Sequence, residues 1–388
     1  MSILTFLVLL ILVAGILTFF QKPLGRKVGK YLPTPFWVYF LSIVLGSVGL
    51  LPQTSPVYSV LGLHALPLAL ILLLIGVPIS SLLRLGPMAL SAMGLGMASM
   101  FVGVVSSFLI FLPWLPSEGP KMAGAMLGTW TGGSANLLSV KEIVGLSDNG
   151  LVPLIVADTF LSYGWLALLI MGVAYQKWFD RKNPKEPAKE QEYGAKQGST
   201  ASLSLKKPWT VVAVFFVGLV LAEIMILIGQ YLSPKFPFLS VKAWAVLLST
   251  TSAVLFSLTK LRKLEDWGAS KIGTFVLYMV LATIGAKTQL GAAKGAGIVL
   301  LFGAVALIVH GSALMVLGRF FKLPMFLLAT ASQANVGGPV SAPIVAGVYK
   351  PGAAHIGVLM AILGAIFGTY IGGFGGWVCQ ILKAWSNN

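Results

Sequence analysis

The chain has 388 residues, of which 57% are hydrophobic and only 10% are charged. Because soluble proteins carry about 25% charged residues, this composition excludes an ordinary soluble domain and predicts a protein that lies mostly in lipid. The 27 basic and 11 acidic residues give a net charge of +16. The basic residues lie mainly between hydrophobic runs, as the positive-inside rule expects, which argues against a nucleic-acid partner.

Apolar runs follow one another along the chain, six on each side of a polar linker at 175–207. The first six runs cover 2–20, 35–51, 61–83, 88–112, 120–145 and 148–174. The last six cover 209–231, 240–257, 268–287, 290–318, 324–348 and 352–382. The first run lacks the basic start and the cleavage site of a signal peptide, so we expect a retained helix that begins outside. The linker holds eight basic and four acidic residues, and we expect a solvated cytoplasmic loop.

The two halves of the chain resemble each other in one segment, which lies at a similar place in each half. The segment Met126–Asn136 has the sequence MLGTWTGGSAN, and Met325–Asn335 has MFLLATASQAN. At a constant offset, the identical residues after the first methionine are Thr131 and Thr330, Ala135 and Ala334, and Asn136 and Asn335. A weaker match near the last helix of each half has the same order, so we expect an internal duplication.

The distribution of basic residues predicts the topology. If the run 120–145 crossed the membrane, the basic linker would lie outside with the N-terminus, against the positive-inside rule. If this run enters and leaves on one face, the basic loops at 21–30, 175–207 and 260–271 are all cytoplasmic. We therefore predict an all-α integral membrane protein of two inverted repeats. Each repeat would have five transmembrane helices and a re-entrant glycine-rich hairpin, and both termini would lie outside.

The hairpin cores place glycines and small polar residues within apolar runs, where helices disfavour them. Non-helical backbone at membrane depth is tolerated only where protein buries it or where it lines a water-filled cavity. A broken helix offers free N–H groups to an anion and free carbonyl groups to a cation such as Na⁺. Glycines also allow close helix packing, but two matched segments favour a binding site. The predicted site residues are Thr131, Gly132, Gly133, Ser134, Asn136, Thr330, Gln333, Asn335, Gly337, Gly338 and Ser341.

Asp158 is the predicted coupling carboxylate, because a charge in the middle of a membrane helix is costly and normally serves ion coupling or pairing. The expected Na⁺ ligands are Ser134, Asn136, Asn335 and Asp158. Two other charged residues lie deep in apolar runs. Glu223 is expected to pair or pack, and Lys287 either has a functional role or extends to the outer membrane boundary. The sequence leaves both roles open.

Three further polar residues are expected to have structural roles. Lys141 and Glu142 end the first hairpin and are expected to reach water, and the isolated His310 is expected to pack through hydrogen bonds. The sequence has no HExxH zinc motif and no Walker A motif. We therefore expect no enzymatic activity and no cofactor other than a coupling Na⁺ or H⁺.

The hairpin segments, together with Lys141-Glu142 and Asp158, resemble the YjcL-type family of bacterial membrane proteins along the whole chain. More distantly, the sequence resembles the cation:proton antiporter and anion transporter superfamily, in particular the sodium:glutamate and 2-hydroxycarboxylate symporters. The segment Val336-Gly-Gly-Pro339 fits that pattern well, and Thr131-Gly-Gly-Ser134 fits it less fully. The second hairpin has no arginine of the kind that citrate-type transporters use for a carboxylate, which argues against a di- or tricarboxylate substrate.

This resemblance implies a transport part that moves against a dimeric scaffold in the bacterial inner membrane. The first repeat would cover 1–174, with scaffold helices in 2–51, a transport part at 61–174 and its hairpin at 120–145. After the linker 175–207, the second repeat would cover 208–388, with scaffold helices in 209–257, a transport part at 268–384 and its hairpin at 324–348.

We expect a secondary active transporter that works by an elevator-type alternating-access mechanism. It would couple Na⁺, or H⁺, to symport of a small organic solute such as an amino acid, a short peptide or an organic acid. One alternative is a Na⁺/H⁺ antiporter without an organic substrate. A second alternative is a non-transporting membrane interaction protein. The sequence does not identify the substrate or the coupling ion.

Overall fold

The computed structural model describes residues 2–29, 32–181, 208–288 and 295–386, and all regular structure in these ranges is helical. Within them, eight helices are long and apolar enough to cross a membrane. Seven of them are α1 (Ser2–Gln21), α7 (Pro87–Phe111), α10 (Asp148–Gly172), α12 (Pro208–Leu232), α14 (Ala269–Lys287), α15 (Ala296–Phe320) and α18 (Ala354–Ser386). The eighth is one continuous helix formed by α4 (Pro56–Val60), η1 (Leu61–Ala65) and α5 (Leu66–Leu74). The predicted all-α, multi-pass membrane class is confirmed.

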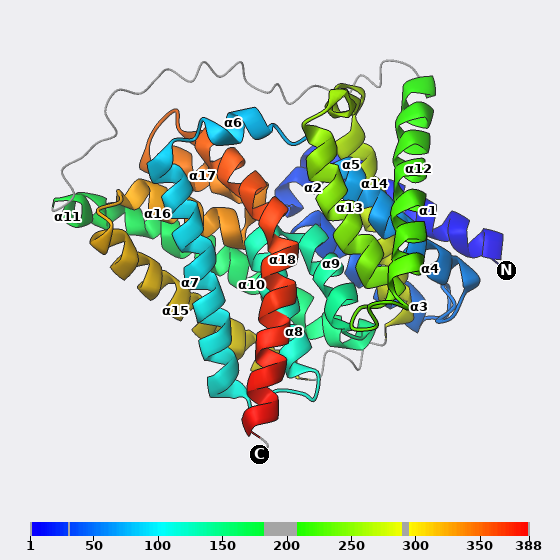
Figure 1. Cartoon of the computed structure of the whole chain (residues 1–388), viewed down its shortest axis with the longest axis horizontal. Helices are drawn as coiled ribbons and strands as arrows, with labels where there is room; N and C mark the ends of the chain where they lie inside the picture. Colours follow the sequence, from blue (N-terminus) through cyan, green and yellow to red (C-terminus); the bar gives the residue numbers. More distant parts are fainter. Residues whose placement is uncertain (1, 30–31, 182–207, 289–294, 387–388) are drawn as a thin grey trace. The chain divides into compact units, whose positions relative to one another are not determined.

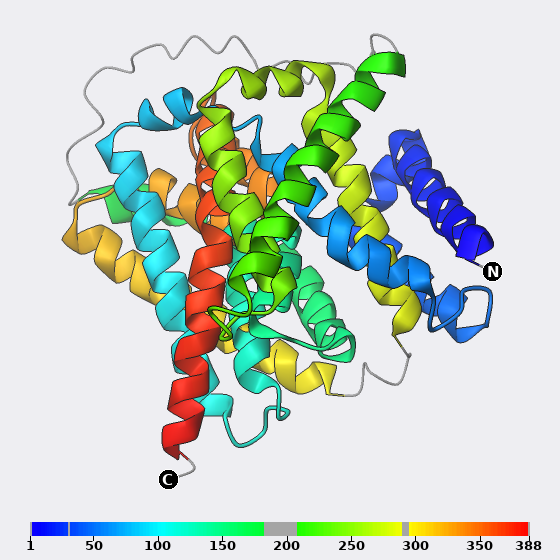
Figure 2. The same cartoon turned by 45° about the vertical axis from the view of Figure 1, so that its right-hand side comes forward.

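Two predicted crossings are shorter than a bilayer requires. Helix α3 (Thr34–Ser47) has 14 residues and α13 (Val241–Ser257) has 17, whereas a crossing needs about 20. After α13 the chain bends by 97° into η3 (Lys260–Trp267), a charged 3₁₀ segment (Figure 2). If that bent pair is one span, the described residues contain nine. The number of ten crossings therefore stays a prediction.

The remaining helices are short or belong to the hairpins. The short ones are α2 (Pro23–Val28), α6 (Ile79–Leu83), η2 (Val173–Tyr175) and α11 (Gln176–Asp180). The first predicted hairpin contains α8 (Gly119–Gly132) and α9 (Ser134–Val144), and the second contains α16 (Met325–Val336) and α17 (Gly338–Tyr349).

The chain divides into two compact units. Unit 1 comprises the described residues within Met1–Val77, Lys141–Thr159 and Leu205–Leu300. Unit 2 comprises those within Pro78–Val140, Phe160–Ser204 and Leu301–Asn388. Unit 1 contains the helices expected to form the scaffold and also α5 and α14, which the sequence places in the transport part. Unit 2 contains α8, α16 and α17 and most of α9, so the cores of both predicted hairpins belong to it.

Unit 1 is organised around α14, which packs against α3 and α5, while α12 packs beside α13 (Figure 1). Small residues bring these helices close together. A side chain at Gly285 of α14 would collide with the backbone of Tyr39, and one at Gly46 of α3 would collide with the backbone of Ala286. Close backbone contact between membrane helices depends on such residues, so α14 joins the first helices of the chain in one unit.

Unit 2 is organised around α18, which runs beside α7 and α8 (Figure 1). Glycines recur at every fourth position on the facing sides of α8 and α18, and a Cβ on one would meet the backbone of the other. The facing pairs are Gly124 with Gly376, Gly128 with Gly372, and Gly132 with Gly368. Packing therefore accounts for the glycines of α8, including Gly132, which the sequence assigned to the binding site.

Candidate functional site

The first hairpin is broken at Gly133, whose φ of 86° lies in the left-handed region that favours glycine. Helix α8 ends at Gly132 and α9 begins at Ser134, which is half-buried. The chain reverses at this break, which places Val140 of α9 beside Gly128 of α8. The two are so close that a Cβ on Gly128 would meet the side chain of Val140. The sequence-predicted interruption of the helix is thus a turn that folds α9 back along α8.

Asn136 fixes this hairpin to α18. Its side chain is buried, and its Nδ2 donates a hydrogen bond of 3.0 Å to the carbonyl oxygen of Ala365. Its Oδ1 accepts one of 3.1 Å from the hydroxyl of Thr369. The amide of Asn136 therefore has partners at both ends, and its oxygen keeps one lone pair for a further ligand.

The second hairpin is broken between α16 and α17, at Gly337 and at Gly338, which has a φ of 65°. Gln333 Nε2 donates a hydrogen bond of 2.7 Å to the hydroxyl of Ser341 across this break. A Cβ on Gly337 would collide with both of these side chains. A side chain at Gly337 would therefore displace Gln333 and Ser341, whereas Gly338 is favoured by its positive φ.

Helix α16 is buried along its whole length, although it carries polar residues at four positions. Those residues are Thr330, Ser332, Gln333 and Asn335. Asn335 Nδ2 donates to the carbonyl oxygen of Ala331 at 3.0 Å, and a Cβ on Gly96 of α7 would collide with the same nitrogen. Yet Asn335 Oδ1 and Gln333 Oε1 are buried and accept no hydrogen bond from any described residue.

The repeated threonines have the same local geometry in both hairpins. Thr131 donates to the carbonyl oxygen of Leu127 at 2.8 Å, and Thr330 donates to that of Phe326 at 2.7 Å. Both are back-bonds to the carbonyl four residues earlier, which hydroxyl residues in membrane helices commonly form. The hydroxyl hydrogens of both predicted site residues are therefore used within their own helices.

His310 on α15 is fully buried and hydrogen-bonds to two other helices. Its Nδ1 lies 2.9 Å from the hydroxyl of Ser99 on α7, and its Nε2 lies 2.9 Å from that of Ser332 on α16. Trp165 Nε1 on α10 also donates to Ser332, at 2.8 Å. These bonds agree with the packing role expected from the sequence.

The predicted Na⁺ ligands fall in different units. Ser134, Asn136 and Asn335 belong to unit 2, whereas Asp158 lies in the part of α10 that belongs to unit 1, where it is half-buried. Ser134, Asn136 and Asn335 therefore belong to one compact unit, and the coupling role of Asp158 stays a prediction.

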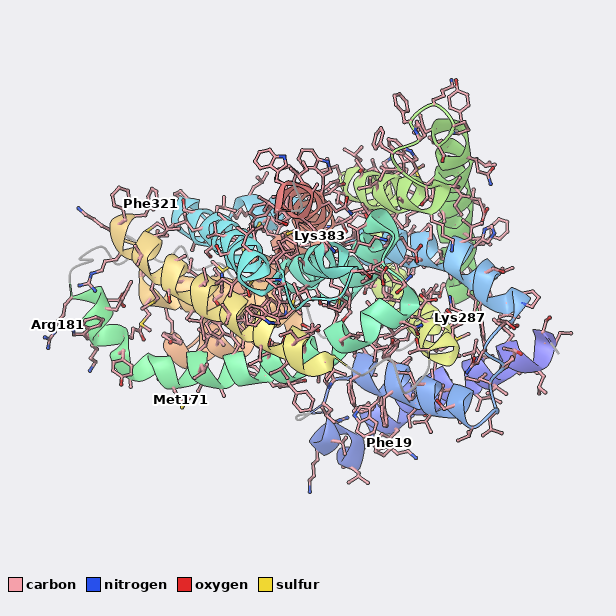
Figure 3. All side chains as sticks on the ribbon, turned by 90° about the horizontal axis from the view of Figure 1, so that it is seen from below. Phe19, Met171, Arg181, Lys287, Phe321 and Lys383 are labelled. Carbon is pink, nitrogen blue, oxygen red and sulfur yellow. The ribbon has the colours of Figure 1, made fainter. Side chains whose placement is uncertain are left out.

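The charged residues of unit 1 form ion pairs. Glu223 Oε1 lies 2.6 Å from Nδ1 of His64, which supports the pairing role that the sequence left open. Lys287, labelled in Figure 3 near the end of α14, lies 2.6 Å from Asp148 Oδ2. Lys141 Nζ lies 2.9 Å from Asp148 Oδ1 and 3.0 Å from Glu142. The expectation that Lys141 reaches water is wrong, because these two carboxylates hold its buried side chain.

Asp148 is the residue of this cluster that the sequence did not single out. It is the first residue of α10 and follows a short loop, which is an ordinary position for an acidic residue at a helix start. The signal available in the sequence was its position seven residues after Lys141, just across the short loop between α9 and α10.

The sequence comparisons agree with this architecture. A family model described as "Protein of unknown function (DUF819)" matches residues 8–383. The chain belongs to this family. It is also 23% identical, over 354 residues, to the "Uncharacterized membrane protein YjcL" of Bacillus subtilis (strain 168), an alignment that covers 88% of each chain. The predicted resemblance to the YjcL-type family is confirmed along almost the whole chain, and so is the class of multi-pass membrane proteins.

Proposed function

We propose that this protein is a secondary active transporter that couples Na⁺ to symport of a small organic solute, with the two hairpins as its binding site. Each half of the chain contributes one hairpin, each hairpin is broken at a glycine, and both cores belong to unit 2. Broken helices paired in this way are the usual binding elements of transporters built from inverted repeats. This supports a distant relation to the sodium:glutamate and 2-hydroxycarboxylate symporters.

The observation that carries the proposal is the pair of buried amide oxygens on α16. More than 90% of buried polar groups in proteins have a hydrogen-bond partner, and an unsatisfied one costs about 1–3 kcal/mol. Asn335 Oδ1 and Gln333 Oε1 have no such partner among the described residues. Neutral oxygens suit a hard cation such as Na⁺, and they also suit the N–H or O–H donors of a solute.

The two oxygens serve different ligands, because residues two apart on a helix point to different sides. We assign the Na⁺ to Asn335 in hairpin 2 and to Ser134 and Asn136 in hairpin 1. We assign the solute to Gln333, whose nitrogen is bonded to Ser341 of the opposite hairpin arm. Hydrogen bonding by neutral groups favours a zwitterion or a monoanion over a highly charged solute.

The proposed mechanism has unit 2 as the moving transport part and unit 1 as the scaffold of a homodimer in the bacterial inner membrane. With five crossings in each half, both termini lie outside and the linker 175–207 lies in the cytoplasm, as the basic residues require. The scaffold then includes α5 and α14 as well as α1, α3, α12 and α13. Full activity of a purified monomer would contradict the dimer.

The experiment is a thermal-stability screen of the purified protein with Na⁺ and a library of small solutes. Ligand at a hundred times its dissociation constant stabilises the folded state by about 2.7 kcal/mol, so binding raises the melting temperature. We expect a Na⁺-dependent shift with one solute class, which Asn335→Ala abolishes and the exposed control Asn149→Ala retains. If Asp158 is the coupling carboxylate, Asp158→Asn abolishes the shift as well. A shift with Na⁺ or pH alone would favour an antiporter. No response to any ligand would favour a non-transporting protein.

A further inference from the structure

Unit 1 contains a cavity of about 320 Å³, to which the hairpins contribute only Lys141 and Glu142 at the end of α9. Its walls come from four stretches: 53–62, 141–148, the start of α13 at Lys242, and 280–287 on α14. The volume is near the lower end of the range of about 300–1,000 Å³ that small-molecule sites occupy. The cavity therefore has room for a small solute and not for a lipid or a folded partner.

The cavity is lined by five charged residues whose charges do not cancel. Lys141, Lys242 and Lys287 supply three positive charges, and Glu142 and Asp148 supply two negative charges. Asp148 is shared by Lys141 and Lys287, and Glu142 pairs with Lys141. Lys242 makes no ion pair with any residue in the part of the chain that the structure describes. One ammonium group thus remains without a carboxylate.

A cluster that served only to hold helices together would have no need of Lys242. The pairs around Asp148 already join the end of the first hairpin to α14, and a further lysine beside them adds like-charge repulsion. The ammonium of Lys242 lies beside η1, 3.8 Å from the position that a Cβ on Gly62 would occupy. Gly62 therefore leaves the unpaired ammonium uncovered on this side, and a methyl group would also fit there in ordinary contact.

The uncharged walls limit the chemistry of a ligand further. The hydroxyls of Tyr58, Ser59 and Thr283 donate to backbone carbonyls of their own segments, so they offer acceptors rather than donors. Gln53, Thr54 and Ser55 add neutral donors, so the only full positive charges in the lining are those of the lysine ammonium groups. Val280 and Ile284 add an apolar wall on α14. Such a lining suits a ligand with one negative charge and a short apolar group.

We propose that this cavity binds a small organic monocarboxylate, with its carboxylate on Lys242 beside Lys287 and its short apolar part against Val280 and Ile284. The site is separate in sequence from the hairpin amides and does not depend on their role. In the topology proposed above, all four stretches lie at the outer ends of their helices, so the cavity receives its anion from outside the cell.

The test is isothermal titration of the full-length purified protein with sodium propionate at constant Na⁺ and ionic strength. We expect saturable binding by the parent protein, a loss of at least tenfold in affinity in Lys242→Gln, and retention in Lys242→Arg. The matched control is Lys263→Gln on η3, an exposed lysine outside the cavity, which should bind propionate like the parent. Sodium chloride and sodium succinate, titrated in the same way, should bind at least tenfold more weakly.

Three results would overturn the inference: no propionate binding by the parent, equal binding by Lys242→Gln, or a preference for chloride or succinate. Asn335→Ala separates the two sites. We expect it to bind propionate normally, because Asn335 lies in unit 2. If it loses propionate binding while Lys242→Gln keeps it, the carboxylate belongs to the hairpins. The cavity proposal would then fail while the transport proposal stands.

Discussion

Gln333 on α16 and Ser341 on α17 are joined by a hydrogen bond of 2.7 Å across the break in the second hairpin. This bond holds the two arms of the hairpin together at the point where the backbone is not helical. It uses the nitrogen of the Gln333 amide and leaves the oxygen without a protein partner among the described residues. The same contact therefore stabilises the turn and leaves available the acceptor that we assign to the solute.

Gly337→Ala should break this arrangement, because the added Cβ collides with the side chains of both Gln333 and Ser341. We expect a lower melting temperature and loss of the solute-induced shift. Gly347→Ala is the matched control in α17, where a Cβ meets nothing within 4 Å. Alanine there should stabilise the helix by about 1 kcal/mol. Equal behaviour of the two variants would contradict the proposed role of the break.

Thr369→Val tests the attachment of the first hairpin to α18. The substitution removes the hydroxyl that donates to Asn136 Oδ1 and leaves a buried oxygen with one partner fewer. Such a loss costs about 1–3 kcal/mol, which thermal denaturation in detergent can measure. Thr369→Ser keeps the hydroxyl and should retain most of the stability. A valine variant as stable as the serine variant would show that this bond does not hold the hairpin.

The Asp148–Lys287 pair is suited to a double-mutant cycle with Asp148→Asn and Lys287→Met. Asp148→Asn also weakens the support of the buried Lys141, so it should be the more destabilising single change. We expect a coupling energy of about 0.5–3 kcal/mol, the range of residues in contact. Additive effects would contradict a direct pair. Asp266→Asn on η3, which is exposed, serves as the neutral control.

The positions of the helix breaks could be predicted from the sequence because glycine and small polar residues interrupt long apolar runs there. Gly133 and Gly337–Gly338 do lie at the ends of helices. The ion pair of Lys287 with Asp148 could not be predicted, because each residue alone is typical of a helix end near water. Only the packing of α14 against other helices of unit 1 brings them together.

The membership of α5 and α14 in unit 1 was also not accessible from the sequence. Hydropathy identifies a helix as membrane-spanning but does not say which helix it packs against, since lipid tails are as apolar as neighbouring side chains. The contact of Gly285 with the backbone of Tyr39 decides this for α14, and no local pattern indicates it. Glycine spacing alone likewise cannot separate the packing role of Gly132 from a binding role.

The most direct test of the central claim is solute uptake by the purified protein in liposomes under an imposed Na⁺ gradient. The solute is the one identified by the stability screen, and Asn149→Ala is the control variant. The account predicts accumulation that collapses when a Na⁺ ionophore dissipates the gradient, and a rate at least tenfold lower in Asn335→Ala. Absence of uptake under both Na⁺ and proton gradients, or uptake unchanged in Asn335→Ala, would contradict transport through the hairpin site.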